Sequence, residues 1–96
     1  MNFEYLPIGS VVLLKESTRR VMIVGLCQRG VKTNKVYDYV GVVFPEGFVS
    51  ADKMFLFDNE QIDIVFSLGY MDEEQMRFLD YAEEKFDELK KASNNE

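Results

Sequence analysis

The side chains best suited to chemistry in this chain of 96 residues are carboxylates and one thiol. Carboxylate oxygens of the kind that bind a divalent cation come together twice, at Asp58, Glu60 and Asp63 and again at residues 72–74. Neither group follows the spacing of a calcium-binding loop, and both lie where a helix is expected to begin. Capping and the helix dipole explain acidic residues at such positions. The sequence therefore predicts no metal ion and no cofactor.

Other catalytic groups are missing from the sequence or poorly placed. The chain contains no histidine, which removes the Ser-His-Asp and Cys-His arrangements and the commonest metal ligand. Cys27, the single cysteine, lies among apolar residues with no evident base nearby, so we expect a buried, unreactive thiol. The glycines match neither a phosphate loop nor a dinucleotide fingerprint. A chain this small also leaves little room for a substrate cleft. The sequence thus predicts a non-enzymatic protein.

Candidate binding residues fall on one expected strand and on one expected helix. Tyr37 and Tyr39 could present aromatic rings to a protein partner, or they could pack in the core or at a sheet edge. The helix carries like charges four residues apart, including Glu84 and Glu88, where a solvated face would more often intersperse lysine. We interpret Glu84, Asp87 and Glu88 as a docking face for a basic protein surface, with an ordinary acidic surface as the alternative.

Basic residues suggest a different partner. Five of them fall on two loops that are expected to lie near the same sheet edge, where single-stranded nucleic acid could bind and stack on the tyrosines: Arg19, Arg20, Arg29, Lys32 and Lys35. The net charge of −6 opposes this interpretation, because the phosphate backbone is itself anionic. The acidity is concentrated in residues 58–96, which carry twelve Asp/Glu against four Lys/Arg. A small nucleic-acid-binding domain therefore stays an alternative only.

The elements that would position these residues form one α+β domain over residues 1–96, with a sheet region at about 6–70. Strands are expected over residues 11–15, 20–27, 36–44 and 54–57, the first two joined as a hairpin. Gly25 and Gly41 lie inside strands and mark bulges or sharp bends. We therefore expect a small, strongly bent antiparallel sheet or partial barrel of about four or five strands.

The connections after the third strand can be assigned in part. Residues 44–47 (FPEG) fit a type I turn, with proline second and glycine fourth. Asp58 is expected to cap one helical turn over residues 59–61. Periodicity leaves residues 62–68 open between a strand and a short helix.

The C-terminal segment predicts an amphipathic helix over residues 72–92, followed by a frayed tail at 93–96. Asp72 is the expected N-cap and Gln75 the N3 residue. Phe78 and Tyr81 are expected to widen the face that packs on the sheet, with exposed aromatic anchors for a partner as the alternative. That apolar face is expected to follow residues at spacings of three and four: Met76, Leu79, Ala82, Phe86 and Leu89.

Several short motifs, taken in order, resemble the family of domain of unknown function 4176 (DUF4176). They are residues 6–14 (LPIGSVVLL), 20–25 (RVMIVG), 37–41 (YDYVG), 45–47 (PEG), 57–63 (FDNEQID) and 69–74 (GYMDEE). The resemblance implies a setting in Gram-positive bacteria, beside LXG toxins exported by the type VIIb secretion system. Such proteins are regarded as small cytoplasmic accessory or chaperone-like partners of those toxins. No catalytic residues are assigned to the family.

We therefore expect a protein-binding accessory partner of a secreted LXG-type toxin. An immunity protein that neutralises a cognate toxin is the first alternative, since small size and acidity fit it equally well. A cytoplasmic location is expected, because the opening residues lack the features of a signal peptide, no apolar run could span a membrane, and the lone cysteine suits a reducing compartment.

Overall fold

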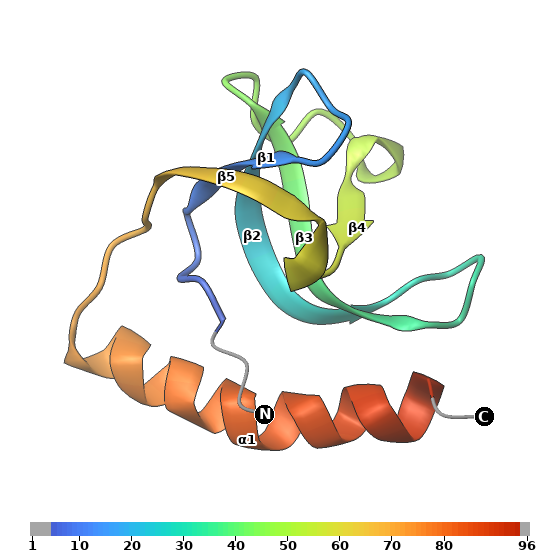
Figure 1. Ribbon diagram of the computed structural model, residues 1–96, viewed down its shortest axis with the longest axis vertical. Coiled ribbons are helices and arrows are strands. Elements are labelled where there is room, and N and C mark those ends of the chain that lie inside the picture. Colours follow the sequence, from blue (N-terminus) through green and yellow to red (C-terminus); the bar gives the residue numbers. More distant parts are fainter. Residues whose placement is uncertain (1–4, 95–96) are drawn as a thin grey trace.

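The computed structural model describes residues 5–94, which form a five-stranded antiparallel sheet beside one long helix (Figure 1). The elements are β1 (Val11–Leu14), β2 (Arg20–Arg29), β3 (Val36–Phe44), β4 (Phe55–Phe57), β5 (Ile62–Ser67) and α1 (Glu73–Asn94). Single 3-10 turns at Ala51–Lys53 and Asn59–Gln61 lie on either side of β4. The strand order is β4-β3-β2-β1-β5, so the sheet stays open with β4 and β5 at its edges. The expected α+β fold is confirmed.

The sequence left residues 62–68 open between a strand and a short helix, and residues 62–67 form a strand. β5 pairs antiparallel with β1, so the last strand of the chain lies beside the first. The helical turn before β5 is also confirmed: the Asp58 backbone N–H donates to Gln61 Oε1 at 2.8 Å, and Gln61 N–H donates back to the Asp58 carbonyl at 3.0 Å.

The sheet is strongly bent where the interior glycines lie. Ile23 pairs with Gly41 and Gly25 pairs with Val40, so Val24 is an extra residue that forms a bulge in β2. A Cβ on Gly41 would lie 2.4 Å from Val21 Cγ1 and 2.9 Å from the Met22 carbonyl oxygen. Only glycine permits this close approach of β3 to β2, and the bend lets the inner face of the sheet curl around the core.

Core side chains come from the sheet, from the segment before β1 and from α1. Tyr39 is the largest of them, and its ring lies 5.8 Å from that of Tyr5 and 5.5 Å from that of Phe57. The core cluster comprises Tyr5, Val12, Val21, Ile23, Leu26, Tyr39, Phe57, Leu79 and Ala82. Every element except β5 and the 3-10 turns therefore contributes a buried side chain.

The predicted apolar face of α1 is only partly correct. Leu79 and Ala82 are buried, but Met76 and Leu89 are 55% and 54% exposed. Each residue turns an α-helix by about 100°, so the six residues from Met76 to Ala82 fall about 120° short of two full turns. Met76 therefore lies on a different side of the helix from Ala82. The side that faces the sheet instead passes through residues 79, 82, 86 and 90.

Two further expectations are wrong. Phe78 and Tyr81 do not widen the buried face of α1, because both rings are exposed and touch only the half-buried ring of Phe86 among the aromatic side chains described. The 44–47 turn does not close over these four residues as expected, because Gly47 N–H donates to the Val43 carbonyl at 2.7 Å. The Phe44–Pro45 peptide is cis. The start of α1 is as predicted, with Gln75 N–H donating to Asp72 Oδ1 at 2.8 Å.

The segment before β1 runs between the sheet and α1 and fastens the connection from β5 to α1 (Figure 1). Gly69 N–H donates to Ser10 Oγ at 3.1 Å, and the buried Ser10 hydroxyl donates to the Pro7 carbonyl at 2.7 Å. A Cβ on Gly69 would come within 1.9 Å of the Ile8 carbonyl oxygen. Two segments almost 60 residues apart thus meet with no room for a side chain. Among residues 5–94, no helix is long and apolar enough to cross a membrane.

We predict that Gly69→Ala lowers the free energy of unfolding by about 2–3 kcal/mol, because the new methyl group forces the Ile8 backbone aside. Gly47→Ala is the matched control, since a Cβ there meets nothing within 4 Å and only the positive φ of 81° opposes it. That strain costs about 1 kcal/mol. Urea denaturation measures both, and an equal loss in the two variants would contradict the close contact.

Candidate functional site

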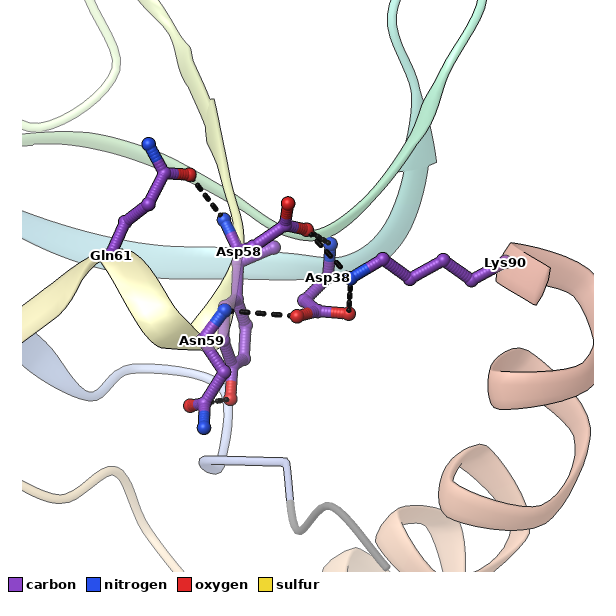
Figure 2. A network of polar contacts seen from close by, with 6 residues as sticks. Asp38, Asp58, Asn59, Gln61 and Lys90 are labelled. Carbon is purple, nitrogen blue, oxygen red and sulfur yellow. Dashed lines mark hydrogen bonds and ion pairs between the residues drawn. The ribbon is translucent and has the colours of Figure 1, made fainter. Parts of the chain in front are cut away.

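One polar network inside the fold joins α1 to the sheet (Figure 2). Lys90 of α1 lies 3.0 Å from Asp38 Oδ1 in β3 and 3.0 Å from Asp58 Oδ1 after β4. The Asp38 side chain is only 6% exposed and that of Lys90 27%. We call these three residues the Lys90 clamp.

Backbone groups complete the environment of both carboxylates. Asp38 Oδ2 accepts the Asn59 N–H at 2.9 Å, and Asp58 Oδ1 accepts the Asp38 N–H at 3.0 Å. The hydroxyl of Tyr39 donates to Asn59 Oδ1 at 3.2 Å and accepts the Leu6 N–H at 2.9 Å. The network therefore links α1, β3, the turn after β4 and the segment before β1.

The surroundings of Lys90 favour its protonated, positively charged form. Burial lowers the pKa of Lys90, but hydrogen bonds and charges from Asp58 and Asp38 outweigh burial and raise the pKa above its ordinary value. The ammonium group stays charged and fills the position where a cation would neutralise the two carboxylates. Within the described part of the chain, no three Cys, Asp or Glu side chains come together in a way that could hold a metal ion. The clamp therefore serves to hold α1 against the sheet.

Cys27 offers no activated thiol. It lies in β2 with a positive φ of 53°, and it is half-buried, whereas the sequence predicted full burial. Burial, followed by the nearby charge of Asp38, raises the pKa of this thiol. A raised pKa keeps the sulfur protonated and weakly nucleophilic.

The most unusual feature of the surface is a run of exposed apolar side chains at residues 64–71, which we call the exposed apolar segment. It begins on the edge strand β5 and continues into the connection to α1. Its large side chains are each at least 43% exposed: Ile64, Val65, Phe66, Leu68, Tyr70 and Met71. Exposed apolar patches of this kind mark interaction sites in proteins.

Hollows lie at both ends of the exposed apolar segment. Tyr70 lines one of them together with Ile8 and Phe78. Phe66 lines the other together with Val11, Met22 and other residues of the outer sheet face. The segment therefore offers both protruding apolar side chains and recesses that could accept a partner's side chains.

The two predicted tyrosines have different surroundings in the structure. Tyr39 is 0% exposed in the core, so its proposed role in partner binding is wrong. The expected strand placed it correctly, but sequence alternation does not say which face is covered. Tyr37 is partly exposed beside the β2–β3 loop, where its hydroxyl lies 3.3 Å from Thr33 Oγ1 and Lys35 lies over its ring.

The predicted acidic face is divided by the way α1 packs. Glu84 and Glu88 are exposed on its outer side. Asp87 is half-buried, pairs with Lys91 at 3.2 Å and borders the Lys90 clamp. Glu84 and Glu88 therefore stay available for docking, whereas Asp87 is partly engaged within the helix.

The basic residues do not gather at one sheet edge, contrary to expectation. Arg19 and Arg20 lie at the start of β2, and Arg29 lies at its end, about 30 Å apart along an extended strand. Arg19 donates to Glu46, the guanidinium of Arg20 lies over the Phe44 ring, and Arg29 donates to the hydroxyl of Ser93 in α1. The five basic residues therefore do not form the single surface that the nucleic-acid alternative assumed.

Comparison with known protein families matches residues 5–78 to the model described as a domain of unknown function (DUF4176). The chain belongs to the DUF4176 family. The match covers all five strands, the start of α1 and the contact between Ile8 and Gly69, so the family motifs coincide with the parts that close this fold. No curated protein and no solved structure matches the chain.

Sequence reasoning missed the Lys90 clamp and the exposed apolar segment of this DUF4176 protein. Asp38 gave a usable signal, because a lone carboxylate inside the apolar run 36–44 needs a buried partner. Nothing in the sequence identified Lys90 as that partner, since a lysine in the last turns of a helix is already explained by the dipole.

We predict that Lys90→Met lowers the free energy of unfolding by about 3 kcal/mol, because the buried Asp38 carboxylate loses its counter-charge. Lys91→Met is the matched control. Its pair with Asp87 is an exposed i,i+4 contact, so the loss there stays below about 0.5 kcal/mol. Urea denaturation followed by circular dichroism measures both. Equal losses in the two variants would show that Lys90 does not clamp the helix.

Alkaline pH provides a second test. The pKa of Tyr5 and that of Tyr39 are raised, mainly by burial, and that of Lys90 is raised too. Each group keeps its proton to higher pH when folded, so its stabilisation is complete below about pH 10 and is lost above it. We predict a falling free energy of unfolding above about pH 10, with a slope up to about 1.4 kcal/mol per pH unit shallower in Lys90→Met. Identical slopes in denaturation series would contradict the raised pKa of Lys90.

Proposed function

We propose that this DUF4176 protein is a non-enzymatic, protein-binding accessory partner of an LXG-type toxin of the type VIIb secretion system. The observation that carries the binding role is the exposed apolar segment at residues 64–71. Six large apolar side chains in eight consecutive residues remain in contact with water in the monomer. Covering such a surface is favourable by about 25 cal/mol for each Å² removed from water.

The chemistry of the interior supports a role without catalysis. The two carboxylates of the Lys90 clamp are occupied by an ammonium group and by backbone N–H groups. The thiol of Cys27 has a raised pKa. Neither arrangement provides the free nucleophile or general base that hydrolysis or group transfer needs.

The acidic outer side of α1 would assist the same interaction. Glu84 and Glu88 are exposed and lie one turn apart. Their charge attracts a basic partner surface over a distance and raises the association rate, while the apolar segment supplies most of the affinity. The family resemblance suggests the toxin as that partner, and a free cysteine suits the reducing cytoplasm in which we place the complex.

We predict that the double variant Leu68→Ser/Tyr70→Ser weakens binding to the cognate toxin at least about tenfold, because exposed aromatic and aliphatic anchors dominate such interfaces. Both side chains are mainly exposed, at 60% and 78%, so folding should be retained. The matched control is Val31→Ser/Phe48→Ser, which removes exposed apolar groups from other loops. Co-expression followed by biolayer interferometry measures the change.

The toxin should be supplied as two separate pieces, its export region and its C-terminal toxic region. Capture of the export region with undiminished toxicity supports the accessory role. Binding of the toxic region with loss of toxicity would replace it with the immunity role. No binding to either piece, or equal weakening by both double variants, would overturn the proposal.

A further inference from the structure

We propose that the free edge of β5 accepts an extended, basic-flanked segment of the protein partner as a sixth strand of the sheet. The inference deepens the proposed function, because it rests on protein binding and names how the partner is held. It assigns the main-chain atoms of β5, as well as its side chains, to the interface.

The two edges of the sheet differ in how open they are. β4 has three residues, and its last residue, Phe57, is buried. β5 has six residues, pairs with no strand but β1 among residues 5–94, and is exposed or half-exposed along its whole length. Lysine and proline, which usually protect an edge from pairing, are absent from it. Register shifts against β1 leave Asp63 and Phe66 as extra residues, and Ile64 and Val65 between them pair regularly. The outward N–H and C=O groups of β5 therefore form a template for another strand.

The side chains of β5 would support an added strand on both faces of the sheet. Val65 lies opposite Val12 and so shares the inner face, whereas Ile64 lies opposite Leu13 on the outer face. Phe66 borders the outer hollow. A strand with alternating apolar residues would cover Ile64 and Val65, the regularly paired part of β5, since cross-strand apolar pairs stabilise a sheet.

The acidic residues around β5 indicate which kind of strand can bind at its edge. Residues 58–76 contain no lysine or arginine but six carboxylates: Asp58, Glu60, Asp63, Asp72, Glu73 and Glu74. Among the ion pairs of residues 5–94, those of Lys90 and Arg77 offset only Asp58 and Glu73 of this set. A second copy of the chain would bring two anionic edges together and repel, whereas a segment flanked by Lys or Arg is attracted. The partner is therefore a basic-flanked strand and not another copy of the chain.

A designed peptide tests the edge without the toxin. The capped peptide KKTVTVTVKK has high strand propensity and basic ends, and we expect it to slow hydrogen exchange at the backbone amides of residues 62–67 in the full-length protein. Two matched peptides should not do so: KKTVPVTVKK lacks a central N–H donor, and EETVTVTVEE carries the opposite charge. Protection elsewhere, or equal protection by all three peptides, would overturn the inference.

Variants then locate the contact. Val65→Lys and Asp63→Lys should each weaken peptide binding about tenfold by placing a cation on the edge, while Val31→Lys in the β2–β3 loop should leave it unchanged. Asp63 is exposed and Val65 is 44% exposed, and circular dichroism checks that the variants fold. Unchanged binding in two folded β5 variants would overturn the inference, as would dimerisation through β5 seen by sedimentation velocity.

The toxin complex separates this inference from the proposed function. A complex that forms and protects residues 62–67 from exchange supports both. A complex that forms but leaves these amides exchanging freely overturns the strand addition and keeps the binding role. Peptide binding at β5 without any toxin complex overturns the toxin assignment and supports the edge as a site for basic-flanked strands.

Discussion

The ammonium group of Lys90 between Asp38 and Asp58 is the interaction on which the arrangement of this molecule depends. The apolar contribution of α1 to the core is small and centres on Leu79 and Ala82. The helix is therefore held over the sheet by the Lys90 clamp together with these apolar contacts. Because a buried carboxylate without a counter-charge is costly, Asp38 makes the docked position of α1 strongly preferred. Tyr39 then extends the same network to Leu6 and orders the segment beneath the sheet.

The buried polar groups of this molecule are hydrogen-bonded, whereas one part of its surface leaves apolar side chains exposed. No described buried side-chain nitrogen or oxygen lacks a hydrogen-bond partner, so the polar interior is complete. By contrast, β5 and the connection to α1 leave apolar side chains in water. Burying those groups inside the monomer would have required α1 to lie across β5, and the Lys90 clamp holds it against β2 and β3. The Lys90 clamp therefore both holds α1 on the sheet and leaves β5 exposed.

Local chemistry made much of this fold predictable from the sequence. Interior glycines marked the bend between β2 and β3, and Asp72 and Asp58 marked helical starts, since each effect acts within a few residues. The errors concern which side of an element is covered. Tyr39, Met76 and Leu89 could not be placed without knowing where α1 crosses the sheet. The basic residues were wrongly grouped because β2 continues to Arg29 and separates its ends. The apolar run of β5 was visible, but its position at the edge depends on pairing with β1.

The pairing of β5 with β1 also determines the order in which this chain can fold. β2 and β3 are joined by a short loop and can form a hairpin early. β5 must find β1 across about fifty residues of intervening chain, and Lys90 must find Asp38 over a similar separation. Closing such loops costs entropy before any contact is gained. The pairing of β5 with β1 is therefore expected to form after the β2–β3 hairpin. A partner that binds at β5 would complete the folding of this protein as well as occupy its surface.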